Sequence, residues 1–344
     1  MAHAPLPRLS ICMATYGRGA FIAQTLDSLL TQLSPDVELV IVNGASPDDT
    51  DHVVRSYIDR FPNIRYILES ANSGVDRDYD KAVNYARGEF CWLMTDDDLL
   101  VPDAIARVLL NLSADLDLLI ANASLSDSTF STVLRPRYLS LGADQVYQSG
   151  DEERFLAETA SYISFIGSVI VRRTWWMERD RSQYFGTLFV HVGVIFQQPS
   201  ASRVRVIADP LIQIRYGNAM WSARTFEIWM IKWPALIWSF SHLSMNARAQ
   251  VCPRDPWRRW RKLGVYRAIG AYSIAEYSTF VRPRLRYFSR AAPFLIAIFP
   301  PRVANFIAAI YCLLINRNRM TAYDLARSTN STSASRFVAR HLGH

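Results

Sequence analysis

The first hundred residues alternate between short apolar runs and longer amphipathic segments. The runs cover residues 9–14, 37–42, 64–68 and 90–94. Between them, apolar residues recur every three or four positions, which is the pattern of helices with one buried face. Strands that are apolar on both faces are typical of a parallel sheet covered by helices on both sides. The sequence therefore predicts an α/β fold with a mostly parallel central sheet.

The fourth apolar run ends in three consecutive carboxylates. Thr95 is followed by Asp96, Asp97 and Asp98. Adjacent anions repel one another, so a fold that gathers them at the end of a buried strand usually supplies a counter-charge. Clustered carboxylate oxygens suit Mg²⁺ or Mn²⁺ carrying a diphosphate. The alternative is a solvated acidic loop that caps a helix starting at Pro102, because aspartate favours N-caps and proline favours the first helical turn.

Other polar clusters follow the remaining apolar runs. Residues 15–18 follow the first run, residues 43–49 the second and residues 72–81 the third. In parallel α/β sheets, ligands bind beyond the carboxyl ends of the strands. We therefore expect these clusters and the aspartate triplet to form one site.

The last quarter of the chain is basic, aromatic and apolar. Residues 252–344 contain 16 Lys or Arg and three acidic residues, a balance of +13 in a chain whose net charge is +7. The arginines flank an apolar block at residues 291–315, which favours attachment to an anionic membrane surface over nucleic-acid binding. Prolines interrupt this block, and its clean run of 13 residues at 303–315 would extend about 20 Å as a helix, against roughly 30 Å of hydrocarbon. We expect a shallow or re-entrant helix, with a buried hairpin as the alternative.

Cysteine usage and the first residues predict the compartment. Cys12, Cys91, Cys252 and Cys312 show no metal-ligand spacing, and two of them lie in predicted core strands, which favours a reducing compartment. The segment before the first apolar run, residues 1–8, is short and contains proline, unlike a signal peptide. We expect a protein at the cytoplasmic face of a membrane.

Five short motifs, in order, resemble those of family 2 glycosyltransferases with the GT-A fold. They are ICMATY at 11–16, SPDDT at 46–50, NSG at 72–74, ARGE at 86–89 and DDD at 96–98. Residues 73–100 and 185–197 are similar, more narrowly, to bacterial O-antigen enzymes of the abequosyltransferase kind. The resemblance implies a nucleotide-binding α/β domain whose acidic motif holds Mn²⁺ or Mg²⁺ on the diphosphate of a sugar donor. A dideoxyhexose such as abequose is one option for the sugar.

The resemblance also implies roles for individual residues. Thr15, Tyr16 and Arg18 would line the nucleotide pocket, Asn43 would contact the base, and Asp76, Asp80 and Lys81 would contact ribose and diphosphate. Asp96 and Asp97 would face the nucleotide sugar, with Asp98 as the direct metal ligand and Asp96 as the second. An amide at Asn43 can both donate and accept, so a UDP-sugar and a CDP-sugar remain open. For the charged turn around Asp80, the alternative is an ordinary solvated helix turn.

A catalytic base is required if the reaction inverts configuration. Relatives place an acidic residue at the start of a helix that corresponds here to residues 187–197, where the polar candidate is His191. A histidine can act as a base, although a lone histidine between two valines is more often structural. Glu178 and Asp180 are lesser candidates. A retaining enzyme would need no base in that position.

These observations predict a glycosyltransferase at the cytoplasmic face of the bacterial inner membrane. Residues 1–221 would form the catalytic domain, with a donor half at 1–111 and an acceptor half at 112–221, residues 222–327 a helical membrane-associating region, and residues 328–344 a disordered tail. The implied acceptor is a polyprenyl-diphosphate-linked glycan. The alternatives are a nucleotidyltransferase that makes nucleotide sugars and a non-catalytic peripheral membrane scaffold.

Overall fold

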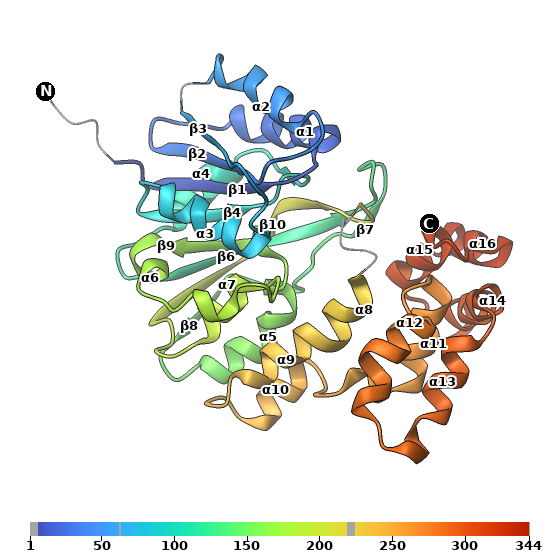
Figure 1. Ribbon diagram of the computed structural model, residues 1–344. Coiled ribbons are helices and arrows are strands. Elements are labelled where there is room, and N and C mark those ends of the chain that lie inside the picture. Colours follow the sequence, from blue (N-terminus) through green and yellow to red (C-terminus); the bar gives the residue numbers. More distant parts are fainter. Residues whose placement is uncertain (1–5, 62, 219–223, 344) are drawn as a thin grey trace, which may run out of the picture. The chain divides into compact units, whose positions relative to one another are not determined.

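The computed structural model describes residues 6–61, 63–218 and 224–343 (Figure 1). These residues divide into two compact units. Unit 1 comprises Met1–Arg215 and His242–Ala247, and unit 2 comprises Tyr216–Ser241 and Arg248–His344. The domain border predicted between Trp221 and Ser222 lies outside the described residues.

One sheet, of ten strands within the described residues, runs through unit 1 (Figure 1). Its order is β3-β2-β1-β4-β9-β6-β10-β5, with β7 beside β6 and β8 beside β10. The strands are β1 (Leu9–Thr15), β2 (Val37–Asn43), β3 (Ile64–Leu68), β4 (Phe90–Met94), β5 (Leu99–Leu100), β6 (Leu118–Ser126), β7 (Val133–Arg135), β8 (Gln145–Gln148), β9 (Val169–Arg172) and β10 (Arg203–Arg215).

The first four strands are parallel, as their apolar runs predict. The remaining strands correct the prediction of a mostly parallel sheet. β9 enters between β4 and β6 and is antiparallel to both, and β10 is parallel to β6 but antiparallel to β5 and β8. β10 is a single long strand, and its pairing with β6 shifts register at Pro210. The sheet is therefore mixed.

The helices of unit 1 connect these strands. They are α1 (Gly19–Leu30), α2 (Thr50–Ile58), α3 (Val75–Tyr85), α4 (Ala104–Asn111), α5 (Glu152–Ile163), α6 (Arg173–Met177) and α7 (Val190–Phe196). Helix α3 packs on β1 and β2. From β1 the chain passes outward to β2 and β3 and returns through α3 to β4, on the other side of β1. The strand order thus reverses between β1 and β4, the place where open α/β sheets bind ligands.

Unit 2 is helical in the described residues. Its helices are α8 (Thr225–Glu227), α9 (Trp233–Ser239), α11 (Trp260–Ile269), α12 (Ile274–Glu276), α13 (Ala291–Ile298), α14 (Pro301–Tyr311), α15 (Arg319–Arg327) and α16 (Ser333–Gly343), and α10 (Met245–Val251) lies across the border of the two units. π-helical turns follow α8, α12 and α14 at Ile228–Lys232, Tyr277–Val281 and Cys312–Asn316.

The prediction of a disordered tail at residues 328–344 is wrong for its described part. Helix α16 occupies Ser333–Gly343, and Val338 is buried in a cluster with Leu325 and Ala309. The Thr332 side chain caps the start of this helix, because its Oγ1 accepts from the Ser335 backbone N–H at 3.2 Å. The polar composition of this tail predicted disorder, but α16 buries apolar side chains, Val338 among them, along one side.

Candidate active site

The loops that follow β1 and β2 are bonded to each other at the carboxyl edge of the sheet. The register sets Thr15 beside Asn43 and Met13 beside Met94. Three backbone N–H groups of the first loop donate to side chains of the second: Gly17 to Ser46 Oγ at 3.0 Å, Arg18 to Thr50 Oγ1 at 2.8 Å and Gly19 to Asp48 Oδ2 at 3.0 Å. Gly17 has a φ of +65°, a conformation that suits glycine. This bonding fixes the backbone that carries Arg18.

Arg18 supplies a counter-charge to the triplet. Its Nε lies 3.4 Å from Asp96 Oδ1 and its Nη2 3.2 Å from Asp97 Oδ2. All three side chains are nearly buried, with exposed fractions of 11–12%. Solvent screens such buried pairs much less than it screens surface pairs.

Arg215 at the end of β10 is a second cation beside the triplet, and no motif in the sequence points to it. Its backbone N–H donates to Asp98 Oδ1 at 2.7 Å, and its Nε donates to the Asp97 carbonyl oxygen at 2.9 Å. The other oxygen of Asp98 accepts from the Thr95 hydroxyl. The antiparallel pairing of β5 with β10 brings these residues together, since Leu99 lies opposite Gln213.

The triplet is electrostatically strained in this structure. Burial, followed by the charge of Asp97, raises the pKa of Asp96 to about 7, against the opposing effect of Arg18. Burial and the charge of Asp97 also raise the pKa of Asp98. Two arginines therefore do not fully offset the cost of burying the carboxylates here. A divalent cation would favour their ionised forms.

The donor set fits a divalent cation that a diphosphate helps to hold. No group of three or more His, Cys, Asp or Glu side chains in the described part of the chain is arranged to hold a metal ion by itself. Mg²⁺ is often held by only one or two carboxylates together with substrate phosphates. Metal-binding carboxylates are commonly hydrogen-bonded by surrounding groups, as Asp98 is by Thr95 and by the Arg215 backbone.

Three predicted nucleotide contacts lie at the ends of β1 and β2. Thr15 is buried next to Asp96, and Tyr16 is 37% exposed. Asn43 is fully buried, and its side-chain amide joins two protein groups: Nδ2 donates to the Tyr66 hydroxyl at 2.8 Å and Oδ1 accepts from the Ser46 backbone at 2.9 Å. Asn43 thus shapes the loop after β2, and its contact with the base stays a prediction.

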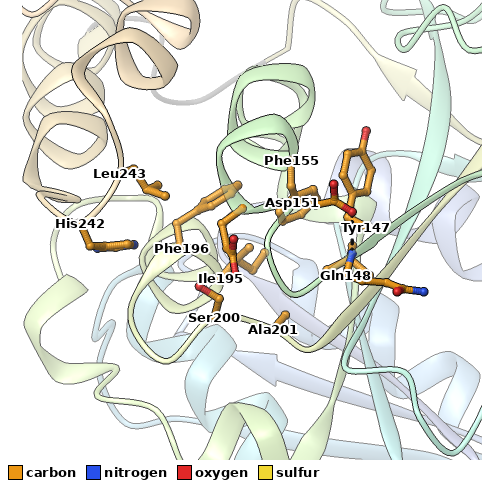
Figure 2. Close-up of a pocket in the computed structure, with 12 residues that line it drawn as sticks. Tyr147, Gln148, Asp151, Phe155, Ile195, Phe196, Ser200, Ala201, His242 and Leu243 are labelled. Atoms are coloured by element: carbon orange, nitrogen blue, oxygen red, sulfur yellow. Dashed lines mark hydrogen bonds between the residues drawn. The ribbon is translucent and has the colours of Figure 1, made fainter.

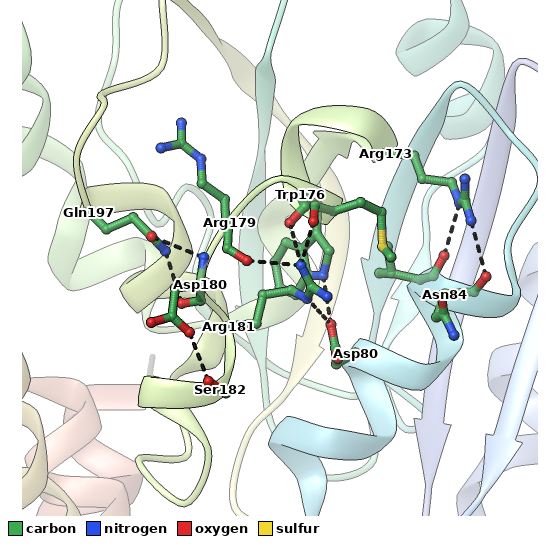
Figure 3. Close-up of polar contacts among 11 residues, drawn as sticks. Asp80, Asn84, Arg173, Trp176, Arg179, Asp180, Arg181, Ser182 and Gln197 are labelled. Atoms are coloured by element: carbon green, nitrogen blue, oxygen red, sulfur yellow. Dashed lines mark hydrogen bonds and ion pairs between the residues drawn. The ribbon is translucent and has the colours of Figure 1, made fainter.

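Asp76 and Asp80 share one face of α3, and both bind other parts of the protein. Asp76 is buried and accepts from the backbone N–H groups of Gly186, Leu188 and Val190 at 2.8–3.0 Å. Asp80 lies 2.7 Å from Arg181 Nε and accepts from Trp176 Nε1 at 3.0 Å (Figure 3). In this structure both carboxylates hold the segment around α6 and α7 against α3.

Asp78, which the sequence analysis did not single out, lies on another side of α3. It is buried and accepts from Ser73 Oγ at 2.5 Å, and a Cβ added at Gly44 would lie 2.7 Å from its Oδ2. Lys81 pairs with Glu69 at 2.7 Å and lies 3.9 Å from Asp78. Asp78 therefore lies beside the loop after β2, and Lys81 lies beside Asp78 and beside Glu69, the residue that follows β3. The sequence did contain a signal for the structural role of Asp76. Tyr79 and Val83, both buried, follow it by three and seven positions, and this helical spacing sets Asp76 on the packed face of α3.

His191 has the surroundings of a core histidine. It is 1% exposed, and its Nε2 lies 2.8 Å from the carbonyl oxygen of Ile163, to which it donates in the neutral form. Its Nδ1 is also shut off from solvent. Burial lowers the pKa of His191 to about 4, which makes it a weak base near neutral pH. The structure does not support the predicted base role. The lesser candidate Asp180 is exposed and accepts from Ser182 Oγ at 2.8 Å (Figure 3).

A pocket elsewhere in unit 1 is unsuited to a nucleotide (Figure 2). Its lining includes Tyr147, Phe155, Phe196, Val204 and His242, and its cavity volume is about 20 Å³, roughly the space of one water molecule. Val204 stands at the start of β10, whereas Arg215 and the triplet stand at its end. The carboxylate site is thus separate from this pocket.

Comparison with known proteins identifies the domain. Residues 10–165 match the model of the family Glycosyl transferase family 2. Over these residues, a little under half of the chain, the protein resembles family 2 glycosyltransferases, and it is a glycosyltransferase. Over 225 residues it is 28% identical to the abequosyltransferase RfbV of Salmonella typhimurium, an alignment that covers 61% of this chain and 67% of that one.

Solved structures support a GT-A-like fold for this glycosyltransferase. The S. aureus TarS 1–349 structure in complex with UDP has a TM-score of 0.57 at 16% identity, covering 97% of this chain and 90% of that chain. The mannosyltransferase PcManGT from Pyrobaculum calidifontis, in complex with GDP-Man and Mn²⁺, has a TM-score of 0.51 at 17% identity, covering 85% and 86%. At these identities the likeness concerns the fold.

The charge of Asp96 predicts a pH dependence of stability. Its folded-state pKa of about 7 lies above the usual 3.8, so in the metal-free protein Asp96 contributes a gain in stability as pH falls through 7 towards 4. We expect Asp96→Asn to raise the free energy of unfolding near pH 8 by about 1–3 kcal/mol and to reduce the gain on acidification. Urea denaturation in EDTA measures both, with the exposed Asp36→Asn as the control. A variant with the wild-type pH dependence would contradict the assignment.

The surroundings of His191 predict that His191→Gln keeps the pH profile of the reaction. A glutamine amide can still donate to the Ile163 carbonyl. Because burial lowers the pKa of His191 from 6.5 to about 4, His191 contributes a loss of stability as pH falls from 6.5 towards 4, opposite in sign to the contribution of Asp96, and the variant should lack this contribution. Rates of donor consumption and urea denaturation across this range check both. Disappearance of the acidic limb of the rate profile in the variant would restore His191 as the base.

Proposed function

We propose that this glycosyltransferase binds a nucleoside-diphosphate sugar together with Mn²⁺ or Mg²⁺ at the aspartate triplet and transfers the sugar to a lipid-linked glycan. The observation that carries the donor half is the buried triplet beside Arg18, at the point where strand order reverses. Raised carboxylate pKa values there indicate a site short of positive charge.

The residues around the triplet suit the departure of a nucleoside diphosphate. Negative charge grows on the diphosphate as the glycosidic bond breaks, and a bound divalent cation would neutralise it as a Lewis acid. Asp98 would hold the cation, with Asp96 as the second ligand. Thr95 and the Arg215 backbone orient the Asp98 carboxylate. Arg18, with its fork of donors beside the same edge, suits the diphosphate oxygens.

The similar proteins support this class of donor. TarS structures hold UDP or UDP-GlcNAc, and the PcManGT structure holds GDP-Man with Mn²⁺. The relative RfbV is named for transfer of abequose. We propose a UDP- or CDP-sugar as the donor, and abequose or another dideoxyhexose as the first sugar to test.

The proposed acceptor is a polyprenyl-diphosphate-linked O-antigen or polysaccharide intermediate, met at the cytoplasmic face of the bacterial inner membrane. The support is the charge of +13 over residues 252–344 and the exposed apolar side chains of α13 and α14. Such a combination favours an anionic lipid surface over nucleic acid. The membrane-associating role of unit 2 belongs to this proposal.

The two alternatives account for fewer observations. A nucleotidyltransferase would need a glycine-rich, cationic phosphate loop at the first turn, whereas residues 17–19 donate their backbone N–H groups to the loop after β2. A non-catalytic scaffold would not account for the buried triplet, nor for the match of residues 10–165 to a glycosyltransferase family.

The product that is released tests the proposal. With Mn²⁺ and the correct donor, the purified protein should release free nucleoside diphosphate and no pyrophosphate. We expect Asp98→Asn to lower turnover by roughly a hundredfold or more, because it removes transition-state charge stabilisation. Asp36→Asn, an exposed change in the same unit, should leave turnover unchanged. Release of pyrophosphate, or wild-type turnover in EDTA, would contradict the proposal.

A further inference from the structure

One side of α14, continued by the π-helical turn that follows it, carries exposed apolar residues at helical spacing. Val303, Phe306, Ile307, Ile310 and Leu314 have exposed fractions of 46%, 50%, 54%, 36% and 67%. We call these five residues the α14 stripe. Single exposed apolar residues are normal on a soluble protein, but a contiguous stripe marks a contact surface. Leu295 and Ile298 on α13 are also about half exposed or more, at 60% and 51%.

The opposite side of α14 is fixed to the rest of unit 2. Ala304, Ala309 and Cys312 are buried in the cluster that includes Leu325 of α15 and Val338 of α16. Asn305 is fully buried on this side, and its Nδ2 donates to the carbonyl oxygens of Ala268 and Leu325 at 3.3 and 3.0 Å. Moving α14 away from these partners would leave the buried Asn305 amide without these hydrogen bonds, which is costly.

This attachment decides between the ways in which α14 could meet a bilayer. No single helix among the described residues is long and apolar enough to cross a membrane, and Ala291–Ile298 with Pro301–Ile315 satisfies length and composition only as a pair bent by 100°. A helix from Pro301 to Ile315 is about 22 Å long, less than the roughly 30 Å of hydrocarbon. With one side bound to protein and the other apolar and exposed, α14 suits contact along its length, parallel to the surface.

Cations stand at both ends of the stripe. Arg302 lies in the first turn of α14, and Arg317 and Arg319 follow its last turn, all exposed. Arginine can keep its guanidinium among lipid phosphates while its stem lies over apolar surface. Two tryptophans of residues 226–240, Trp229 and Trp238, are half-buried. Trp233 is buried, and Trp238 Nε1 donates to the Cys252 carbonyl at 3.1 Å.

We infer that the α14 stripe docks in the plane of an anionic lipid bilayer, with its side chains at the headgroup boundary and Arg302 and Arg319 among the phosphates. The inference rests on the proposed membrane location of the acceptor and names the surface that achieves it. Charge complementarity is the argument for this occupant, because a second copy of the chain would bring an equally cationic rim to the same stripe.

Vesicle binding of the full chain tests the inference without donor or acceptor. The vesicles contain phosphatidylethanolamine and phosphatidylglycerol, and binding is measured by co-sedimentation. We expect Ile307→Asp with Leu314→Asp to weaken binding roughly tenfold or more, because two charges replace apolar side chains that the bilayer would bury on docking. The matched control is Leu110→Asp with Met245→Asp, two changes at residues 85% and 71% exposed in unit 1, which should bind like the wild type. Vesicles of phosphatidylcholine alone should bind the wild type more weakly.

Three results would overturn the inference. If the wild type binds vesicles and the stripe variant binds equally well, another surface makes the contact and the membrane proposal stands. If the wild type does not bind while its donor turnover is intact, the membrane proposal fails and the glycosyltransferase assignment stands. If light scattering without lipid shows a dimer that the stripe variant abolishes, a second copy covers the stripe. Circular dichroism melts of each variant confirm that it is folded.

Discussion

Repulsion among three buried carboxylates is the constraint on which the rest of unit 1 depends. Asp96, Asp97 and Asp98 stand at the carboxyl end of β4, and the fold brings one arginine to them from each side. Arg18 is held by the bonded loops after β1 and β2, and Arg215 by the pairing of β10 with β5. The pKa values of Asp96 and Asp98 are still raised. The structure thus maintains a site of unmet negative charge, which is what a cation carrying a diphosphate requires.

The charged residues near this edge divide into two groups by what they bind. Asp76 and Asp80 are committed to backbone N–H groups and to Arg181 across the interior of unit 1. Their contribution is to position the segment around α7 by hydrogen bonds whose loss would leave buried donors unpaired. Asp96 and Asp97, by contrast, form side-chain ion pairs with Arg18. Such an ion pair can be exchanged for a ligand more cheaply than a buried backbone bond can be broken.

Sequence patterns predicted the part of the fold that local periodicity determines. Four apolar runs correspond to β1 to β4, and the triplet follows the fourth run, at the carboxyl end of β4. The reversal of strand order between β1 and β4 was not predicted. Pairing between distant segments could not be predicted from these patterns. Nothing in residues 169–172 indicates that β9 runs antiparallel to β4. Nothing in residues 203–215 indicates that Arg215 contacts Asp98, 117 positions earlier. The helical phase of α3 separates Asp76 from Asp78, but it shows what each faces only once the partner segments are placed. Polar composition misled at α16, since Val338 and the side-chain cap at Thr332 outweigh it.

The central claim is that the triplet binds a divalent cation and a nucleoside diphosphate together. Titration calorimetry of UDP, CDP and GDP, with Mn²⁺ and with EDTA, tests it most directly in the wild type and in Asp98→Asn, after circular dichroism shows that the variant is folded. The account predicts that one nucleotide binds only with Mn²⁺ and that the variant loses this binding. Equal binding in EDTA, or unchanged binding by Asp98→Asn, would contradict it.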